Sequence, residues 1–190
     1  MNGLEDMSSE ELRQLFPIFL VAHNDDWTNW YEEEKKSILD LLADKFSVSV
    51  HHIGSTAIPK IWAKNIVDIL LEADNRQSLQ EIKTILLANG WLFMSKTETR
   101  ISLKKGYTTS GFAPRVFHLH LRLLGDCDEL YFRDYLIKHP KTAKAYEELK
   151  LSLWKKFEHD RNSYTEAKAD FIRKYTELEK QKGDKNRKIL

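Results

Sequence analysis

The sequence predicts an α+β fold, in which helices flank a small mixed β-sheet and further helices pack on it at the C-terminal end. Strand and helix patterns alternate up to about residue 123, whereas the pattern from Asp128 onward is helical alone. Residues 66–71 are almost entirely apolar, which is typical of a central strand buried on both faces. Together these observations favour one sheet covered by helices.

The first elements follow from capping signals and helical spacing. Ser8 and Glu11 form a capping box that opens a short helix ending near Leu15. Residues 17–21 are predicted to form a short strand, and the Asn-Asp-Asp sequence at 24–26 then opens a longer helix. The core-facing positions of that helix are Trp27, Trp30, Tyr31, Ile38, Leu41 and Leu42.

The middle of the chain supplies the sheet. The predicted strands are residues 48–53, 66–71, 91–94, 100–103 and 116–123, with a helix over 79–86 that ends at Asn89-Gly90. The last strand alternates most clearly, because Phe117, Leu119, Leu121 and Leu123 fall on one face and His118, His120 and Arg122 on the other.

Helices interrupted at His139-Pro140 follow to the C-terminus. Arg133 and Asp134 are predicted to form an ion pair that fastens these helices to the sheet. The last basic residues, including Lys188, are predicted to form a frayed tail.

Length and composition indicate one domain. The 190 residues are about one domain's worth of chain, and 42% hydrophobic and 11% aromatic residues can form a sizeable core. We expect a single domain over residues 1–190, with a core at about 15–178, an N-terminal helix extension at 1–14 and a basic tail at 179–190. The net charge of +1 argues against a nucleic-acid partner.

The N-terminus and the cysteine count bear on the compartment. Cys127 is the only cysteine, so the chain can form neither an internal disulfide nor a thiolate zinc site. The N-terminal residues are acidic and lack the apolar stretch of a secretory signal. The longest apolar run, residues 18–22, is far shorter than the ~18 residues of a membrane span. We therefore expect a cytoplasmic protein with no membrane partner.

The segment with the most chemistry is the turn that follows the strand at 48–53. Gly54 would let the backbone approach a ligand, and Ser55 and Thr56 add hydroxyl groups that could bind a phosphate. Asp68, on the neighbouring strand, could hold the divalent ion that accompanies a polyphosphate. The alternative is an ordinary tight turn beside an unrelated strand carboxylate.

A set of motifs in order resembles the GrpB family of bacterial proteins, from about Leu15 to Tyr175. These motifs are HIGSTAIP, AKNIVDI, HLHL, FRDYL-x-x-HP, AYEELK and YTEAKADFI. The resemblance implies a fold of the nucleotidyltransferase type, typified by DNA polymerase β. Because some GrpB-like domains are fused to dephospho-coenzyme A kinase, it also implies a link to coenzyme A metabolism.

The resemblance assigns roles to particular residues. Gly54 and Ser55 match the motif that contacts the phosphates in nucleotidyltransferases, with Thr56 and Lys64 close by. Asp68 matches the first acid of the motif that binds two metal ions. The position of the second acid holds Leu70, and the position of the third holds His120. The chain therefore departs from the two-metal pattern at two of three positions.

Histidines could replace the missing acids. His118 and His120 share one strand face, and His52 ends the strand before the turn. We expect Asp68, His118, His120 and His52 to hold one divalent metal ion, Mg, Mn or Zn, with Asp68 and His120 as catalytic residues. In the alternative, His120 is a structural residue that only orients Asp68.

These features lead to three functional hypotheses. The first is a metal-dependent nucleotidyltransferase-like enzyme that binds a nucleotide or another phosphate-bearing small molecule, with Gly54, Ser55, Thr56 and Lys64 at the phosphates. The second is a binding module of the same kind without catalysis. The third is an adaptor that uses the C-terminal helices as a partner surface. Tyr164 and Lys168 either close over the cleft or pack between helices.

Overall fold

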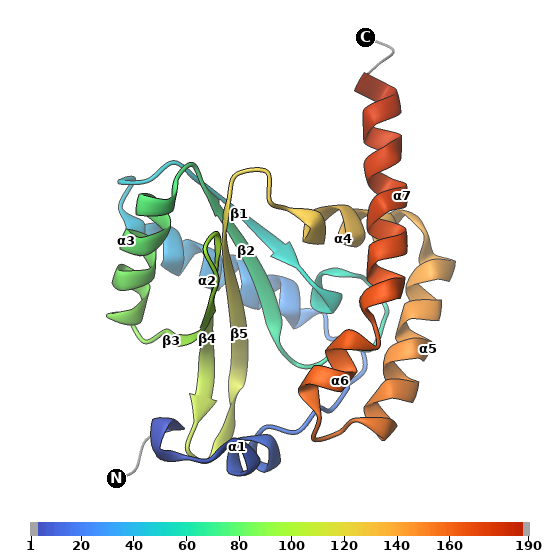
Figure 1. The fold of residues 1–190 in the computed structure, drawn as a ribbon, viewed down its shortest axis with the longest axis horizontal. Coiled ribbons are helices and arrows are strands. Elements are labelled where there is room, and N and C mark those ends of the chain that lie inside the picture. Colours follow the sequence, from blue (N-terminus) through green and yellow to red (C-terminus); the bar gives the residue numbers. More distant parts are fainter. Residues whose placement is uncertain (1–3, 188–190) are drawn as a thin grey trace.

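One mixed sheet of five strands organises the molecule, in the order β1-β2-β5-β4-β3 (Figure 1). The structure is a computed structural model that describes residues 4–187, with side chains as far as residue 182. The strands are β1 (Val48–Ile53), β2 (Val67–Ala73), β3 (Leu92–Lys96), β4 (Arg100–Thr108) and β5 (Gly111–Leu123). β2 and β5 are parallel, and the other neighbouring pairs are antiparallel. The predicted α+β class with a small mixed sheet is confirmed.

Helices lie on both sides of this sheet. They are α1 (Ser9–Leu15), α2 (Asp26–Leu42), α3 (Arg76–Leu87), α4 (Asp128–Lys138), α5 (Pro140–Lys156), α6 (Arg161–Glu166) and α7 (Ala169–Arg187), with 3-10 turns η1 (Leu4–Asp6) and η2 (Ser55–Ala57). Figure 1 shows α4 to α7 gathered at one side of the molecule and α2 and α3 beside the sheet. None of the described helices combines the length and the hydropathy that a membrane span requires.

The main core lies between the sheet and the helices α2 and α3. Alternate residues of β2 and β5 point to this face, and α2 adds buried side chains at helical spacing. Its members include Trp27, Ile38, Ile69, Leu71, Ile82, Leu119 and Leu121, all fully buried. This packing fixes the register of the two central strands, because a slip by one residue would turn every apolar side chain to the other face.

A second core joins the C-terminal helices to the loop after η2. Phe132 and Leu136 of α4 and Tyr146 of α5 pack there against Ile58 and Ile61. Arg133 pairs with Asp134 and also donates a hydrogen bond of 2.8 Å to the carbonyl of His52 at the end of β1. The predicted ion pair is present, but it lies within α4, and the hydrogen bond from Arg133 to His52 is what joins this helix to the sheet.

Two expectations about local structure were wrong. Residues 17–21 form no strand and make a single bridge between Val21 and Ala63. Pro17 has no backbone N–H, and the N–H of Ile18 donates to the Glu158 carbonyl outside the sheet. The segment expected to be frayed is helical as far as Arg187, because Glu179 packs into the fold and pairs with Lys138. Lys188 lies outside the described residues.

Candidate functional site

The turn after β1 and the carboxylate of β2 are in direct contact. Gly54 has φ +72°, and a Cβ atom placed on it would lie only 2.4 Å from Oδ2 of Asp68. The contact follows from the register, since Ile53 pairs with Asp68 and Gly54 comes next in the chain. Position 54 therefore requires glycine for its backbone conformation and for its neighbour.

Two histidines of β5 face the same carboxylate. Asp68 pairs in register with His118 on the parallel strand, and His120 follows on the same face. Nδ1 of His118 lies 3.2 Å and Nε2 of His120 lies 3.5 Å from Oδ1 of Asp68. In the part of the chain that the structure describes, these three residues form the group whose potential metal-ligating atoms all lie within 4.8 Å of one another.

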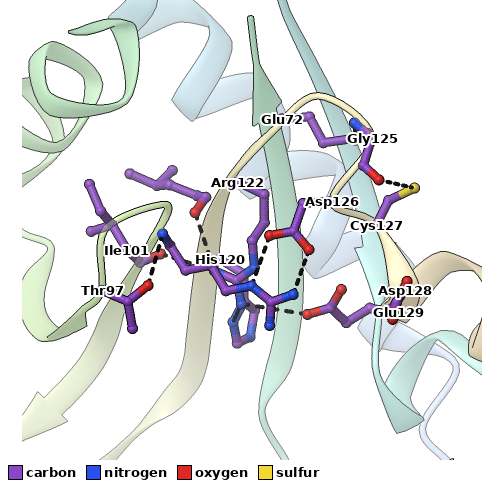
Figure 2. A network of polar contacts seen from close by, with 12 residues as sticks. Glu72, Thr97, Ile101, His120, Arg122, Gly125, Asp126, Cys127, Asp128 and Glu129 are labelled. Atoms are coloured by element: carbon purple, nitrogen blue, oxygen red, sulfur yellow. Dashed lines mark hydrogen bonds and ion pairs between the residues drawn. The ribbon is translucent and has the colours of Figure 1, made fainter. Parts of the chain in front are cut away.

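Each histidine has a second polar partner behind it. Nε2 of His118 lies 2.8 Å from the Tyr107 hydroxyl, which accepts a hydrogen bond of 3.1 Å from Arg161. Nδ1 of His120 accepts a hydrogen bond of 3.3 Å from the guanidinium of Arg122, a contact that Figure 2 shows within a larger polar network. Arg122 is buried and donates further to the Leu121 carbonyl at 3.2 Å.

These partners decide which nitrogens carry hydrogen. A guanidinium only donates, so Nδ1 of His120 must accept and the hydrogen of a neutral ring lies on Nε2, facing Asp68. By the same reasoning the Arg161–Tyr107 bond favours a hydroxyl that donates to His118, whose Nδ1–H then faces Asp68. Two N–H groups thus converge on one carboxylate oxygen.

The electrostatics agree with an ionised Asp68 beside a neutral His118. Burial alone would raise the pKa of Asp68, but the hydrogen bonds from His118 and His120 outweigh it and hold this pKa well below its usual range. Burial lowers the pKa of His118 in spite of the neighbouring carboxylate. Asp68 therefore stays negatively charged throughout the physiological pH range.

This donor set is a poor match for the metal sites of the nucleotidyltransferase pattern. Two magnesium ions need several carboxylates, and the cluster offers one. A single Mn or Zn ion would fit the spacing. Both imidazoles would then need the other tautomer, with the hydrogen on the ring nitrogen that faces away from Asp68. His120 cannot adopt that tautomer while Arg122 donates to its Nδ1. The geometry favours the alternative in which His120 orients Asp68, and occupancy by Mg, Mn or Zn stays a prediction.

The structure does not bring His52 to this cluster. His52 pairs with Ile69, so its side chain points to the α2 face of the sheet, opposite to Asp68. It stacks on Tyr31 at 4.8 Å and lies 3.0 Å from the Thr56 hydroxyl, while burial lowers its pKa to about 4. The expectation that His52 joins a metal site is wrong for this reason of strand parity.

A cavity of about 300 Å³, here called the central cavity, opens beside Asp68 between the sheet and the C-terminal helices. Ser55, Thr56 and Lys64 line it, whereas Gly54 contacts Asp68 and lines a neighbouring cavity, so phosphate binding by these residues stays a prediction. Three more basic residues line it: Lys150 from α5, Arg161 from the start of α6 and Lys168 from the α6–α7 junction. The Nζ atoms of Lys64 and Lys168 lie 5.3 Å and 4.1 Å from the centre of the Tyr164 ring, and Tyr164 and Lys168 both line the cavity, so the contacts agree with helix packing as well as with closure over the cleft.

The central cavity carries an excess of positive charge. Asp68 is the sole carboxylate among the described residues that line it, against four basic side chains. Burial, with nearby cations, lowers the pKa of Lys64 to about 7, and burial lowers that of Lys150 to about 7 and that of Lys168 to about 8. Lys150 also donates to the Trp62 carbonyl. One buried lysine and three half-buried basic side chains without matching carboxylates indicate a site for an anion.

Sequence reasoning missed Lys150 and Arg161. Lys150 ends the AYEELK motif, but this motif is as typical of helix packing as of ligand binding. Arg161 follows a helix cap at Asp160, and nothing in its neighbourhood distinguishes it from a surface charge. Their role depends on the packing of α5 and α6 beside β2, which no local pattern contains.

The family is established by comparison with known proteins. The family description "GrpB protein" matches residues 17–178. The chain belongs to the GrpB family. UPF0157 protein YqkA of Bacillus subtilis is 33% identical over 159 residues, which span 82% of this chain and 45% of that protein. UPF0157 protein SCO7215 of Streptomyces coelicolor is 32% identical over 158 residues, which span 82% of this chain and 80% of that protein.

A solved structure of a GrpB protein shows the same fold. The conserved protein GrpB from Enterococcus faecalis superposes with a TM-score of 0.74 at 24% identity, over 86% of this chain and 98% of that one. A weaker likeness, with a TM-score of 0.47 at 13% identity over 78% of this chain and 46% of the other, is to the Cid1 poly(U) polymerase. Within this GrpB-family fold, the Gly-Ser turn, the β2 aspartate and the β5 histidine lie close to one another, and the roles that the resemblance assigns to them stay predictions.

Proposed function

We propose that this protein is nucleotidyltransferase-like and binds a nucleotide, or another phosphate-bearing small molecule, in the central cavity. The observation that carries the proposal is the charge of this cavity, in which Lys64, Lys150, Arg161 and Lys168 surround one carboxylate. Grouped lysine and arginine side chains are typical ligands of phosphate oxygens. The hydroxyls of Ser55 and Thr56 line the same space and could donate to those oxygens.

In a transfer reaction, Asp68 would bind and orient the hydroxyl group of the acceptor. Its Oδ1 is held by the two histidines, which fixes the plane of the carboxylate. An acceptor hydroxyl bound to it would form a bond to the α-phosphorus while the bond to the pyrophosphate oxygen breaks. The hydroxyl proton would leave to solvent water, because the lowered pKa of Asp68 makes its carboxylate a weak base that orients the hydroxyl by accepting its hydrogen bond. The basic side chains would neutralise the charge that develops on pyrophosphate.

Isothermal titration tests phosphate binding directly. The ligands are ATP and inorganic triphosphate, in buffer with EDTA and then with Mg or Mn. Lys64→Gln and Lys168→Gln should each weaken binding about tenfold, as expected for the loss of a charge-assisted hydrogen bond. Lys141→Gln, exposed on α5, is the matched control and should leave affinity unchanged. Equal affinity in all variants, or no binding by the wild type, would contradict the proposal.

The same titration tests the metal prediction. Binding that persists in EDTA agrees with the hydrogen-bond directions at His120, because the lysines then supply the charge that metal ions would supply. Binding that appears only with Mn or Mg would show that the cluster of Asp68, His118 and His120 accepts a metal ion after all.

A non-catalytic module is the second candidate. Leu70 is fully buried where the two-metal pattern requires an acid, and His120 is held by Arg122. Both observations favour binding without transfer. Incubation with α-labelled nucleotides and a range of small hydroxyl acceptors separates the candidates, since a labelled product would exclude the module. The implied link to coenzyme A metabolism stays a prediction, and coenzyme A precursors belong among those acceptors.

A further inference from the structure

A second cavity of about 310 Å³, here called the apolar cavity, adjoins the central one. Lys64, Ile66 and Arg161 line both, so they form a shared wall. Beyond this wall the lining is almost entirely apolar and includes Pro17, Phe19, Phe112 and Pro114. Its volume lies at the lower end of the ~300–1,000 Å³ that is usual for small-molecule sites.

The apolar cavity is built from flat side chains. Phe112 is held between Phe16 at 5.0 Å and Tyr107 at 5.2 Å, and Phe19 lies at 5.9 Å from it with its own side chain partly exposed. Aromatic and proline faces are the surfaces on which planar rings stack. The geometry of the lining thus suits a ring better than a charged or highly hydrated group.

One polar group reaches this cavity besides the two cations of the wall. Asn65 lines it, and Oδ1 of Asn65 accepts a hydrogen bond of 2.7 Å from the buried indole of Trp27. This bond fixes the orientation of the carboxamide, whose NH₂ group remains a donor. Such a donor matches the ring nitrogens and carbonyl oxygens at the edge of a nucleobase.

We propose that the apolar cavity holds the base of a nucleotide whose phosphates lie against Lys64 and Arg161 in the central cavity. This inference rests on the proposed function and assigns the base and the phosphates of its ligand to separate cavities. Lys64 and Arg161 face both spaces, so they can bind the phosphate nearest the nucleoside. The N-terminal segment at residues 17–19 thereby gains a role in ligand recognition.

A competing site lies between α4 and α7. A cavity of about 460 Å³ there also adjoins the central one, through Ser55, Tyr146 and Thr165. Charges on its rim are already paired within the protein: Asp128 with Lys180 at 2.7 Å, and Arg173 with Asp170 at 2.7 Å. The shared wall of the apolar cavity instead presents two basic side chains toward the phosphate end of the ligand, which is why we favour it.

The test compares two ligands on the full chain. Wild-type protein should bind ATP at least about tenfold more tightly than inorganic triphosphate. Phe19→Ala should reduce this preference about fivefold to tenfold, the lower end of the range for loss of one stacking partner because Phe19 is partly exposed, and leave triphosphate affinity within about twofold. Ala113→Trp, which fills the cavity, should do the same. Tyr131→Ala, a partly exposed ring on α4, is the matched control.

Other results would overturn the inference in distinguishable ways. If triphosphate binds and ATP binds no better, the proposed function survives and the base subsite fails. If Phe19→Ala and Ala113→Trp leave the ATP preference intact, the base lies elsewhere. Photolabelling with 2-azido-ATP then locates it: label in residues 16–21 or 111–116 supports the apolar cavity, and label in α4 or α7 rejects it. If neither ligand binds, both proposals fail.

Discussion

The two faces of the β2–β5 strand pair differ as sharply as any two regions of the molecule. On the face under α2 and α3, Ile69, Leu71, Leu119 and Leu121 are fully buried hydrocarbon. On the opposite face the same two strands present Asp68, His118 and His120 to a cavity. The alternation of a strand puts neighbouring residues of one sequence segment into these two settings.

The comparison shows that the polar face depends on the apolar one. Packing under the helices fixes the register that sets Asp68 opposite His118. The polar face also buries side chains, among them Leu70, His118 and Arg122, whereas Asp68 and His120 are only half-buried and line the central cavity. Substitutions on the two faces should therefore separate stability from ligand binding.

The largest stability effect is expected on the apolar face. Leu119→Ala should lower the free energy of unfolding by about 2–5 kcal/mol, because it removes buried methyl groups and leaves a cavity. Urea denaturation measures this loss. Leu124→Ala, whose side chain is mostly exposed, is the control and should change stability by less than about 0.5 kcal/mol. Folded Leu119→Ala protein should still bind triphosphate normally.

A substitution at Gly54, where the turn after β1 contacts Asp68, should affect both stability and ligand binding. Gly54→Ala should destabilise the fold by about 1–3 kcal/mol, from backbone strain and from the collision with Asp68. It should also weaken triphosphate binding, since the carboxylate must move. Gly90→Ala separates these causes: Gly90 also has positive φ, but nothing lies within 4 Å of an added Cβ. Equal destabilisation by the two variants would show that the Asp68 contact does not matter.

The smallest effect concerns pH. Lys64 and Lys150, with pKa values of about 7, and Lys168, at about 8, lose their protons as the pH rises from 6.5 to 9, so triphosphate affinity should fall. Lys64→Arg should bind more tightly than wild type at pH 9, because arginine keeps its charge. The ligand has the same ionisation state in both titrations at each pH, so it does not affect the difference between wild type and Lys64→Arg. Identical pH profiles would exclude Lys64 as the titrating group.

Without ligand the same lysines imply a trend in stability. Their pKa values are lower in the fold than the ordinary 10.5, so the unfolded chain binds more protons between about pH 7 and 10.5. The free energy of unfolding should therefore rise with pH over this interval. Lys64→Met should flatten the rise, and denaturation at pH 7 and pH 9 measures both slopes.

Local sequence patterns predicted the part of the site that lies within one segment. The Gly54 turn, the Asp68 strand and the alternation around His118 each follow from neighbouring residues. The prediction for His52 neglected the alternation of side chains along a strand. His52 pairs with Ile69 and therefore points to the α2 side of the sheet, although it lies close to the turn in sequence. Arg122 was placed on the same strand face as His120, but its hydrogen bond to that ring depends on side-chain direction. Arg161 could not be placed, since its contact with Tyr107 depends on helix packing.

The strand expected at 17–21 shows a different limit. Its apolar composition is real, and Ile18 and Leu20 are buried, but Pro17 and the bond to Glu158 lead the backbone away from the sheet. Burial of an extended segment does not require strand pairing.

The closeness of Gly54 to Asp68 makes the two positions interdependent in evolution. While an aspartate occupies position 68, any side chain at position 54 meets its carboxylate. Shortening residue 68 first would open room at the turn, so the second change would then be less harmful than when made alone. A lineage that lost the acid would escape this collision but not the strain of a side chain at φ +72°, so the constraint on the glycine would weaken without disappearing.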